Sequence, residues 1–96
     1  MAMDIGILEK KHMVSILLYL YARGSATRMD IYNDIANNDH MPDKFKVLED
    51  AGLLTQRIRI PGRAIVLELT DKGTTVASLL QQVDSMISGD GSRLPE

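Results

Sequence analysis

The 96-residue chain contains no cysteine and no tryptophan, and it has only one phenylalanine and three tyrosines. The missing cysteines exclude disulfides, thiolate metal sites and cysteine nucleophiles, so nothing indicates an oxidising compartment. The longest nearly apolar run, residues 13–22, is too short to span a bilayer. Residues 1–11 lack the apolar stretch of a secretory signal. We therefore expect a soluble cytoplasmic protein with a core of aliphatic side chains.

The parts of an enzyme are missing as well. The sequence has no glycine-rich phosphate loop and no cluster of metal ligands, and its two histidines, His12 and His40, are isolated. We expect no catalytic residue, no cofactor and no metal, and we place His12 on a solvated turn of the first helix. The net charge of −2 counts against nucleic-acid binding, because such domains usually carry a basic surplus. A small negative total still leaves room for one basic face.

Apolar residues at helical spacing predict the first two helices. The first spans residues 7–23, and Gly24 after it is a typical helix stop. The second follows a cap from Ser25 or Thr27 and runs to about residue 36.

A third helix ends near Ala51. It buries a stripe formed by Met41, Phe45 and Leu48, which are four and three residues apart. Pro42 has no backbone N–H to donate, so it must lie in the first turn of this helix.

The period of the pattern then changes from helix to strand. Residues 55–60 alternate between polar and apolar except at Gln56, and residues 65–69 alternate again. Pro61 and Gly62 between them fit the central positions of a type II turn, so we expect an antiparallel hairpin. Thr70 caps a last helix over residues 71–87. The domain is expected to cover residues 1–87, with a disordered tail over 88–96.

Two short segments carry a recognisable pattern. Residues 48–54 (LEDAGLL) resemble the L-E-x-x-G-L-hydrophobic segment that ends the recognition helix of winged-helix regulators. Residues 69–73 (LTDKG) are similar to their L-T-x-x-G segment between the wing and the last helix. The resemblance covers about residues 8–87 and is to the broad group of the MarR, PadR and ArsR types. It implies a mainly α fold with a small β-hairpin (α+β): a winged helix-turn-helix with a three-helix core, a wing and a C-terminal helix.

In this group the third helix enters the major groove, and the hairpin, or wing, reaches a minor groove or the backbone. The resemblance therefore implies duplex DNA as the partner, with eight candidate contacts: Arg28, His40, Asp43, Lys44, Lys46, Arg57, Arg59 and Arg63. Three wing guanidiniums within a few residues suit phosphates or a narrow minor groove. The alternative is a solvated strand face that pairs with Glu68. Taken alone, Lys44, Lys46 and Arg28 each fit a solvated charge better than a contact, and His40 fits a surface histidine with no role at least as well.

The start of the third helix departs from the pattern of the group. Where Ser, Thr or Arg usually faces the bases, this chain has Asp39, His40, Pro42 and Asp43. Aspartates suit a helix N-terminus because they offset the dipole. They also face the expected phosphates, so we expect the wing to supply most of the DNA affinity. Asp43 is nevertheless able to accept a hydrogen bond from cytosine.

The last helix predicts assembly. Its apolar stripe is wider than a thin three-helix core covers, and such a stripe usually marks an interface; it consists of Val76, Leu79, Leu80, Val83, Met86 and Ile87. We expect a homodimeric, DNA-binding transcriptional regulator. The alternative is a winged helix that acts as a protein–protein interaction module, which the acidic pI favours, and RNA binding is a distant third. No feature of the sequence indicates a small-molecule effector.

Overall fold

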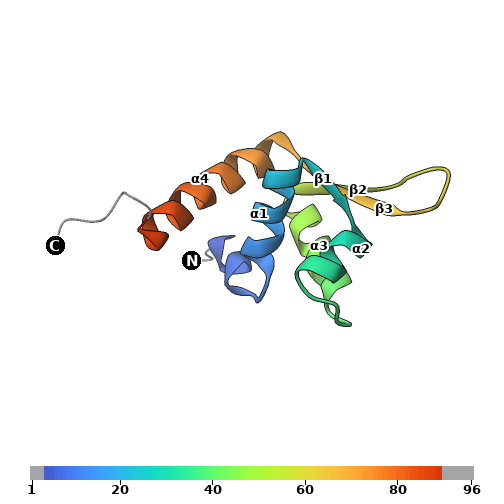
Figure 1. Ribbon diagram of the computed structural model, residues 1–96, viewed down its shortest axis with the longest axis horizontal. Coiled ribbons are helices and arrows are strands. Elements are labelled where there is room, and N and C mark those ends of the chain that lie inside the picture. The colour runs from blue at the N-terminus through green and yellow to red at the C-terminus, as the bar shows by residue number, and fades with distance from the viewer. Residues whose placement is uncertain (1–3, 90–96) are drawn as a thin grey trace.

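The computed structural model describes residues 4–89. Over this range a 3-10 helix precedes four α-helices and three strands, in the order η1 (Asp4–Glu9), α1 (Met13–Arg23), β1 (Ser25–Thr27), α2 (Arg28–Asp34), α3 (Met41–Asp50), β2 (Leu54–Ile58), β3 (Ile65–Leu69) and α4 (Asp71–Ser88). The β2–β3 hairpin projects from one side of the helices, and α4 leads away on the other (Figure 1). This arrangement confirms the predicted α+β class. The hairpin, residues 54–69, is called the wing below.

One apolar cluster joins the helices to the sheet. Helix α1 lies at its centre, because four of its side chains are completely buried: Met13, Ile16, Leu17 and Leu20. The predicted stripe of α3 is confirmed, since Met41, Phe45 and Leu48 are also fully buried. Burial of large aliphatic side chains is the main term that stabilises such a small domain.

The first helix begins later than predicted. An α-helix starts only at Met13, and residues 4–9 form the separate 3-10 helix η1. His12 lies between them with a left-handed φ of 72°, which breaks the helical path. The apolar spacing of residues 7–23 runs through this break, because Ile7 and Leu8 pack against the same core from η1.

Helix α2 begins after Thr27, which is one of the two expected capping residues. The Thr27 hydroxyl accepts from the Asp30 backbone N–H at 3.1 Å, and the Asp30 carboxylate accepts from the Thr27 N–H at 3.0 Å. This reciprocal capping box satisfies two N–H groups that the helix leaves free. The helix ends at Asp34, earlier than the predicted residue 36.

The sheet contains a strand that the sequence pattern does not reveal. Strand β1 is three residues long and pairs antiparallel with β3, so the strand order is β1-β3-β2. Ala26 of β1 lies opposite Leu67, and both are buried. Three residues are too few to show an alternation, so only the pairing with β3 identifies this strand.

The end of α3 turns directly into β2. Gly52 has φ +80°, and its N–H donates to the Glu49 carbonyl at 2.9 Å while the Leu53 N–H donates to the Leu48 carbonyl at 3.0 Å. This is the Schellman pattern, which requires a residue in the left-handed region. The pattern returns Leu53 and Leu54 to the core, as the LEDAGLL segment predicts.

The second motif holds the start of α4 against the end of α3. The Thr70 hydroxyl accepts from the Gly73 N–H at 3.0 Å and donates to the Gly52 carbonyl at 2.6 Å, and the Thr70 N–H donates to the Leu53 carbonyl at 3.1 Å. Gly73 is buried so closely that a Cβ there would lie 1.8 Å from the Leu53 carbonyl oxygen. The two motifs are therefore two halves of one joint.

The turn of the wing differs from the predicted type II turn. That turn would join the Arg63 N–H to the Ile60 carbonyl, but the Arg63 N–H donates instead to the Arg59 carbonyl at 2.9 Å. The Arg59 N–H donates to the Ala64 carbonyl at 2.8 Å, so four residues, 60–63, form the tip. Gly62 and Arg63 both have positive φ, at 104° and 58°.

Helix α4 extends beyond the rest of the domain (Figure 1). It ends at Ser88, one residue later than predicted, and Gly89 follows in the left-handed region with φ 69°. The predicted disordered tail from residue 90 onward lies outside the described residues. Within residues 4–89 no helix is long and apolar enough to cross a membrane.

Candidate nucleic-acid interface

The outward face of α3 is mixed in charge and mainly acidic. Its exposed residues are Asp43, Lys46 and Asp50, which lie opposite the buried stripe. The Lys46 ammonium lies 3.6 Å from the Asp50 carboxylate, so part of its charge is already balanced. His40 is exposed just before the helix, and its backbone N–H donates to the Asn38 side chain at 2.9 Å. Pro42 lies in the first turn, as predicted.

Lys44 occupies a different flank of the same helix. It is half-buried and lines a hollow of about 240 Å³ together with Lys10, His40, Asp43 and Val47. This hollow faces the end of η1, because Lys10 follows that helix directly. The structure therefore does not bring Lys44 and Lys46 together on one face.

Arg28 is partly buried, and its guanidinium is hydrogen-bonded within the domain. Its Nε and one terminal nitrogen donate to the Gln56 side-chain oxygen at 3.0 and 2.6 Å. The guanidinium carbon also lies 5.4 Å from the centre of the Phe45 ring, within the range of a cation–π contact. Arg28 thus connects the start of α2 to the wing strand and to the core side of α3.

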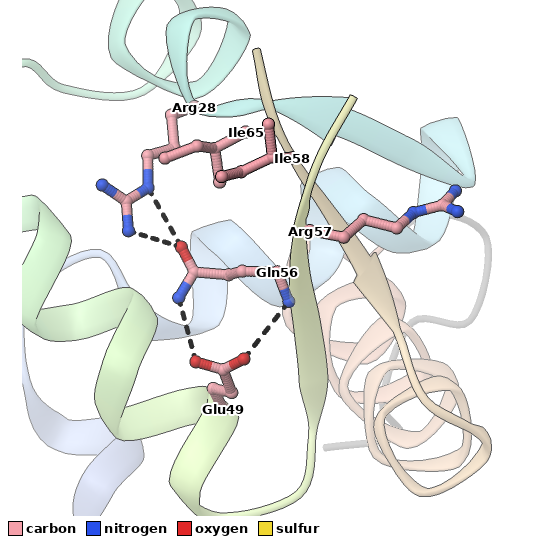
Figure 2. A pocket seen from close by; sticks show the side chains of 6 residues that line it. All are labelled: Arg28, Glu49, Gln56, Arg57, Ile58 and Ile65. Atoms are coloured by element: carbon pink, nitrogen blue, oxygen red, sulfur yellow. Dashed lines mark hydrogen bonds between the residues drawn. The ribbon is translucent and has the colours of Figure 1, made fainter. Parts of the chain in front are cut away.

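Gln56 continues this connection to α3, as Figure 2 shows. Its side-chain amide donates to one oxygen of Glu49 at 3.2 Å, and its backbone N–H donates to the other at 3.4 Å. Neither Gln56 nor Glu49 was expected at the site. The available signal was that Gln56 interrupts the strand alternation with a polar side chain on the helix-facing side of β2.

The three wing arginines differ in their surroundings. Arg57 points to the opposite side of β2 from Gln56 (Figure 2), and its guanidinium lies 3.5 Å from the Glu68 carboxylate. This pair matches the alternative of a solvated strand face, although an exposed pair of this kind contributes little to stability. Arg59 and Arg63 are exposed near the tip, and neither forms a salt bridge within residues 4–89.

The charge of Arg59 acts on the start of α2. The pKa of Asp30 is lowered, chiefly because the Thr27 N–H donates to its carboxylate, and the charges of Arg23 and Arg59 lower it further. Arg23 lies 3.6 Å from Asp30.

Helix α1 is tied to α2 by a second polar cluster. The Tyr19 hydroxyl donates to the Asp34 carboxylate at 2.5 Å, and this hydrogen bond raises the pKa of Tyr19. Arg23 stacks over the Tyr19 ring at 5.2 Å and donates to its hydroxyl at 3.0 Å. These contacts join α2 to α1.

The predicted dimer residues fall into two groups. Val76 and Leu80 are partly buried and pack against the core. The others leave half or more of their surface exposed: Leu79 56%, Val83 50%, Met86 53% and Ile87 79%. The second half of α4 therefore presents an apolar face that its own domain does not cover.

Comparison with known proteins supports the fold. No family model matches the sequence, and no curated protein matches it. Solved structures do match. A transcriptional regulator homologue from Pyrococcus horikoshii OT3 is 24% identical, with a TM-score of 0.67 over 90% of this chain and 95% of that chain.

Two further matches are more distant in sequence. A mutant of MepR from a multidrug-resistant S. aureus clinical isolate is 21% identical, with a TM-score of 0.74 over 96% of this chain and 73% of that chain. Overoxidised AbfR bound to DNA is 17% identical, with a TM-score of 0.68 over 85% of this chain and 62% of that chain. The chain therefore has the winged helix-turn-helix fold that these solved structures share.

Proposed function

We propose that this protein binds duplex DNA as a homodimeric transcriptional regulator. The observation that carries the proposal is the wing, which projects away from the helices (Figure 1) and presents Arg59 and Arg63 free of salt bridges within residues 4–89. Guanidiniums in this state are available to phosphates, which they bind through charge-assisted hydrogen bonds. The similarity to AbfR, whose solved structure contains DNA, supports the same use of the fold.

In this proposal the wing supplies most of the affinity. Helix α3 enters the major groove, but its outward face brings Asp43 and Asp50 towards the phosphates, and Lys46 is paired with Asp50. Arg59 and Arg63 contact the minor groove or the backbone. Lys44, Lys46, His40 and Arg57 remain candidate contacts whose contribution is smaller.

Arg28 has a different role in the same proposal. Since its guanidinium is bonded to Gln56, it positions the wing relative to α3 instead of neutralising a phosphate. The chain Arg28–Gln56–Glu49 joins α2, β2 and α3, so the spacing between the two DNA-binding elements depends on it.

The dimer forms through α4. Four neighbouring apolar side chains on one helix are at least half exposed, and burying them against a second copy is favourable at roughly 25 cal/mol for each Å² removed from water. A two-fold axis at α4 would place the two α3 helices about one DNA turn, roughly 34 Å, apart or at a multiple of that distance. Val83→Asp with Met86→Asp should give monomers in sedimentation velocity experiments and weaken DNA binding. A monomeric unmodified chain at tens of micromolar would contradict the dimer.

Salt-dependent DNA binding tests the main proposal. Fluorescence anisotropy with a labelled duplex should give a steep log–log dependence of affinity on salt, with a slope of about −0.9 for each phosphate neutralised. Arg59→Ala with Arg63→Ala should reduce the slope by about 2 and weaken all duplexes alike. The control is Lys11→Ala, which removes one positive charge between η1 and α1, outside the wing, and should reduce the slope by less than the double substitution. The proposal is overturned if folded protein binds no duplex at low salt.

One observation favours a second function. The outward face of α3 carries two carboxylates and one paired lysine, which suits a basic protein surface better than DNA. The second function is supported if the protein fails to bind DNA at every salt concentration and Asp43→Asn abolishes its binding to a protein partner.

A further inference from the structure

The tip of the wing combines exposed apolar side chains with free positive charge. Ile60 is 84% exposed, the highest value among the large apolar side chains of residues 4–89, and Ile58 is 63% exposed. Ile60 and Pro61 are the first two residues of the four-residue tip, with Arg59 just before them and Arg63 at the end of the tip. The wing projects from the helices (Figure 1), so the domain core cannot cover this tip.

We infer that Ile60 and Pro61 form an apolar wedge that enters the minor groove of duplex DNA, while Arg59 and Arg63 hold the flanking phosphates. This inference rests on the proposed DNA-binding function and extends it to how the DNA is recognised. Contact with phosphates alone needs the two arginines but gives no reason for an exposed isoleucine between them. An apolar protein partner would cover Ile60 but leave two guanidiniums without counter-charges. The minor groove offers both surfaces, because phosphates line it and a base step that is partly unstacked exposes the apolar faces of its bases.

The shape of the tip agrees with this use. The hydrogen bonds from Arg63 to Arg59 and from Arg59 to Ala64 close the hairpin to a single narrow ribbon end. The positive φ values of Gly62 and Arg63 turn the chain back sharply, so Ile60 and Pro61 are presented at the end of the ribbon. Proteins that insert Ile or Pro into the minor groove partly unstack a base step and kink the duplex.

A wedge implies a particular kind of specificity. The cost of unstacking is lowest at flexible pyrimidine–purine steps such as TA and CA/TG, and it is higher in stiff A-tracts. The wing would therefore select deformable sites without reading base edges. This fits an α3 whose exposed face is acidic and poor in groups that donate to bases.

Measuring how far the protein bends labelled DNA duplexes tests the inference. Two duplexes of equal length and composition are compared by fluorescence energy transfer between their ends, one with a central TA step and one with a central A-tract. The unmodified protein should bend the TA duplex and bind it more tightly. Ile60→Ser changes no charge, so it should leave the salt slope unchanged, abolish the bend and weaken binding to the TA duplex by about tenfold.

The control is Ile5→Ser, which changes an equally apolar, 61% exposed side chain on η1, and circular dichroism verifies that both variants fold. If Ile60→Ser binds and bends DNA like the unmodified chain, the wedge is wrong while DNA binding stands. If the unmodified chain binds duplexes without bending them, the wedge is equally wrong. If it binds no duplex but binds vesicles of phosphatidylglycerol, the Ile–Arg tip is a membrane contact, and the wedge and the proposed function both fail.

Discussion

Substitution of Gly73 is the most direct test of the joint between α3 and α4. Gly73 lies in the first turn of α4, and its backbone packs against the backbone of Leu53, the residue just before the wing. In Gly73→Ala the new Cβ would lie 1.8 Å from the Leu53 carbonyl oxygen and 2.8 Å from its carbon, whereas real Cβ atoms keep at least 3.0 Å from such neighbours. Backbone atoms cannot rotate away as a side chain does. Either α4 or the start of β2 must therefore move.

The free energy of unfolding should fall despite the better helix propensity of alanine. Replacing glycine by alanine inside a helix normally stabilises by about 0.5–1 kcal/mol. Overpacking a closely packed site costs about 1–3 kcal/mol or more. Movement of the helix would also weaken the hydrogen bonds that the Thr70 hydroxyl forms with Gly52 and Gly73. The clash is the larger effect, so we expect a net loss of about 2–3 kcal/mol. For a domain of this size that lowers Tm by roughly 10–20 °C.

Urea and thermal unfolding followed by circular dichroism measure this loss. The matched control is Gly6→Ala, because a Cβ at Gly6 meets nothing within 4 Å and its backbone does not need a positive φ. Gly6→Ala should change Tm by no more than a few degrees. If Gly73→Ala is as stable as the unmodified chain, the close approach of α4 to Leu53 is wrong, and steric contact does not explain the glycine of the LTDKG segment.

Substitutions at four further positions test other contacts. Thr70→Ala removes a helix cap and should lower the free energy of unfolding by about 1–2 kcal/mol in urea titrations, whereas Thr70→Ser should restore most of it. Gln56→Leu leaves Arg28 without its hydrogen-bond acceptor, so it should weaken DNA binding in anisotropy assays while the salt slope stays unchanged. A changed slope would mean that the Arg28 guanidinium contacts a DNA phosphate. Asp43→Asn should tighten non-specific DNA binding modestly and less at high salt, and a loss confined to one sequence would show that Asp43 reads a base. The lowered pKa of Asp30 means that its stabilising contribution is present above the ordinary value of 3.8 and is lost as pH falls through the lower, folded-state value. The difference in urea midpoint between the unmodified chain and Asp30→Ala should therefore shrink on acidification from pH 7 to below 3.8, and a constant difference would contradict this.

The dependable sequence predictions were those based on local backbone chemistry and on long periodic patterns. The buried stripe of α3, the placement of Pro42, the cap at Thr70 and the strand at residues 65–69 agree with the structure. Each follows from a property of a few neighbouring residues, such as a missing N–H, a hydroxyl at a helix start or a fixed repeat. Helix ends were less accurate, because apolar spacing continues through η1 and His12 without showing the break between them.

The candidate site shows the opposite case. The resemblance made six basic side chains candidate DNA contacts, but their neighbours in space separate them. Arg28 is bonded to Gln56, Lys46 to Asp50 and Arg57 to Glu68, and only Arg59 and Arg63 of the wing and second-helix arginines are free of such contacts within residues 4–89. A sequence records the charge of a side chain but not the acceptor that lies beside it after folding.

The sequence by itself determined the order of the four α-helices and the hairpin and the two glycine-containing motifs of the winged helix, because capping, turn and periodicity rules act over a few residues. Only the tertiary structure decided that β1 joins the sheet and that the two motifs meet at Gly73. It also decided which arginines remain available at the wing. These features depend on pairs of residues such as Ala26 and Leu67, or Arg28 and Gln56, which are far apart in the chain and meet only when the core forms.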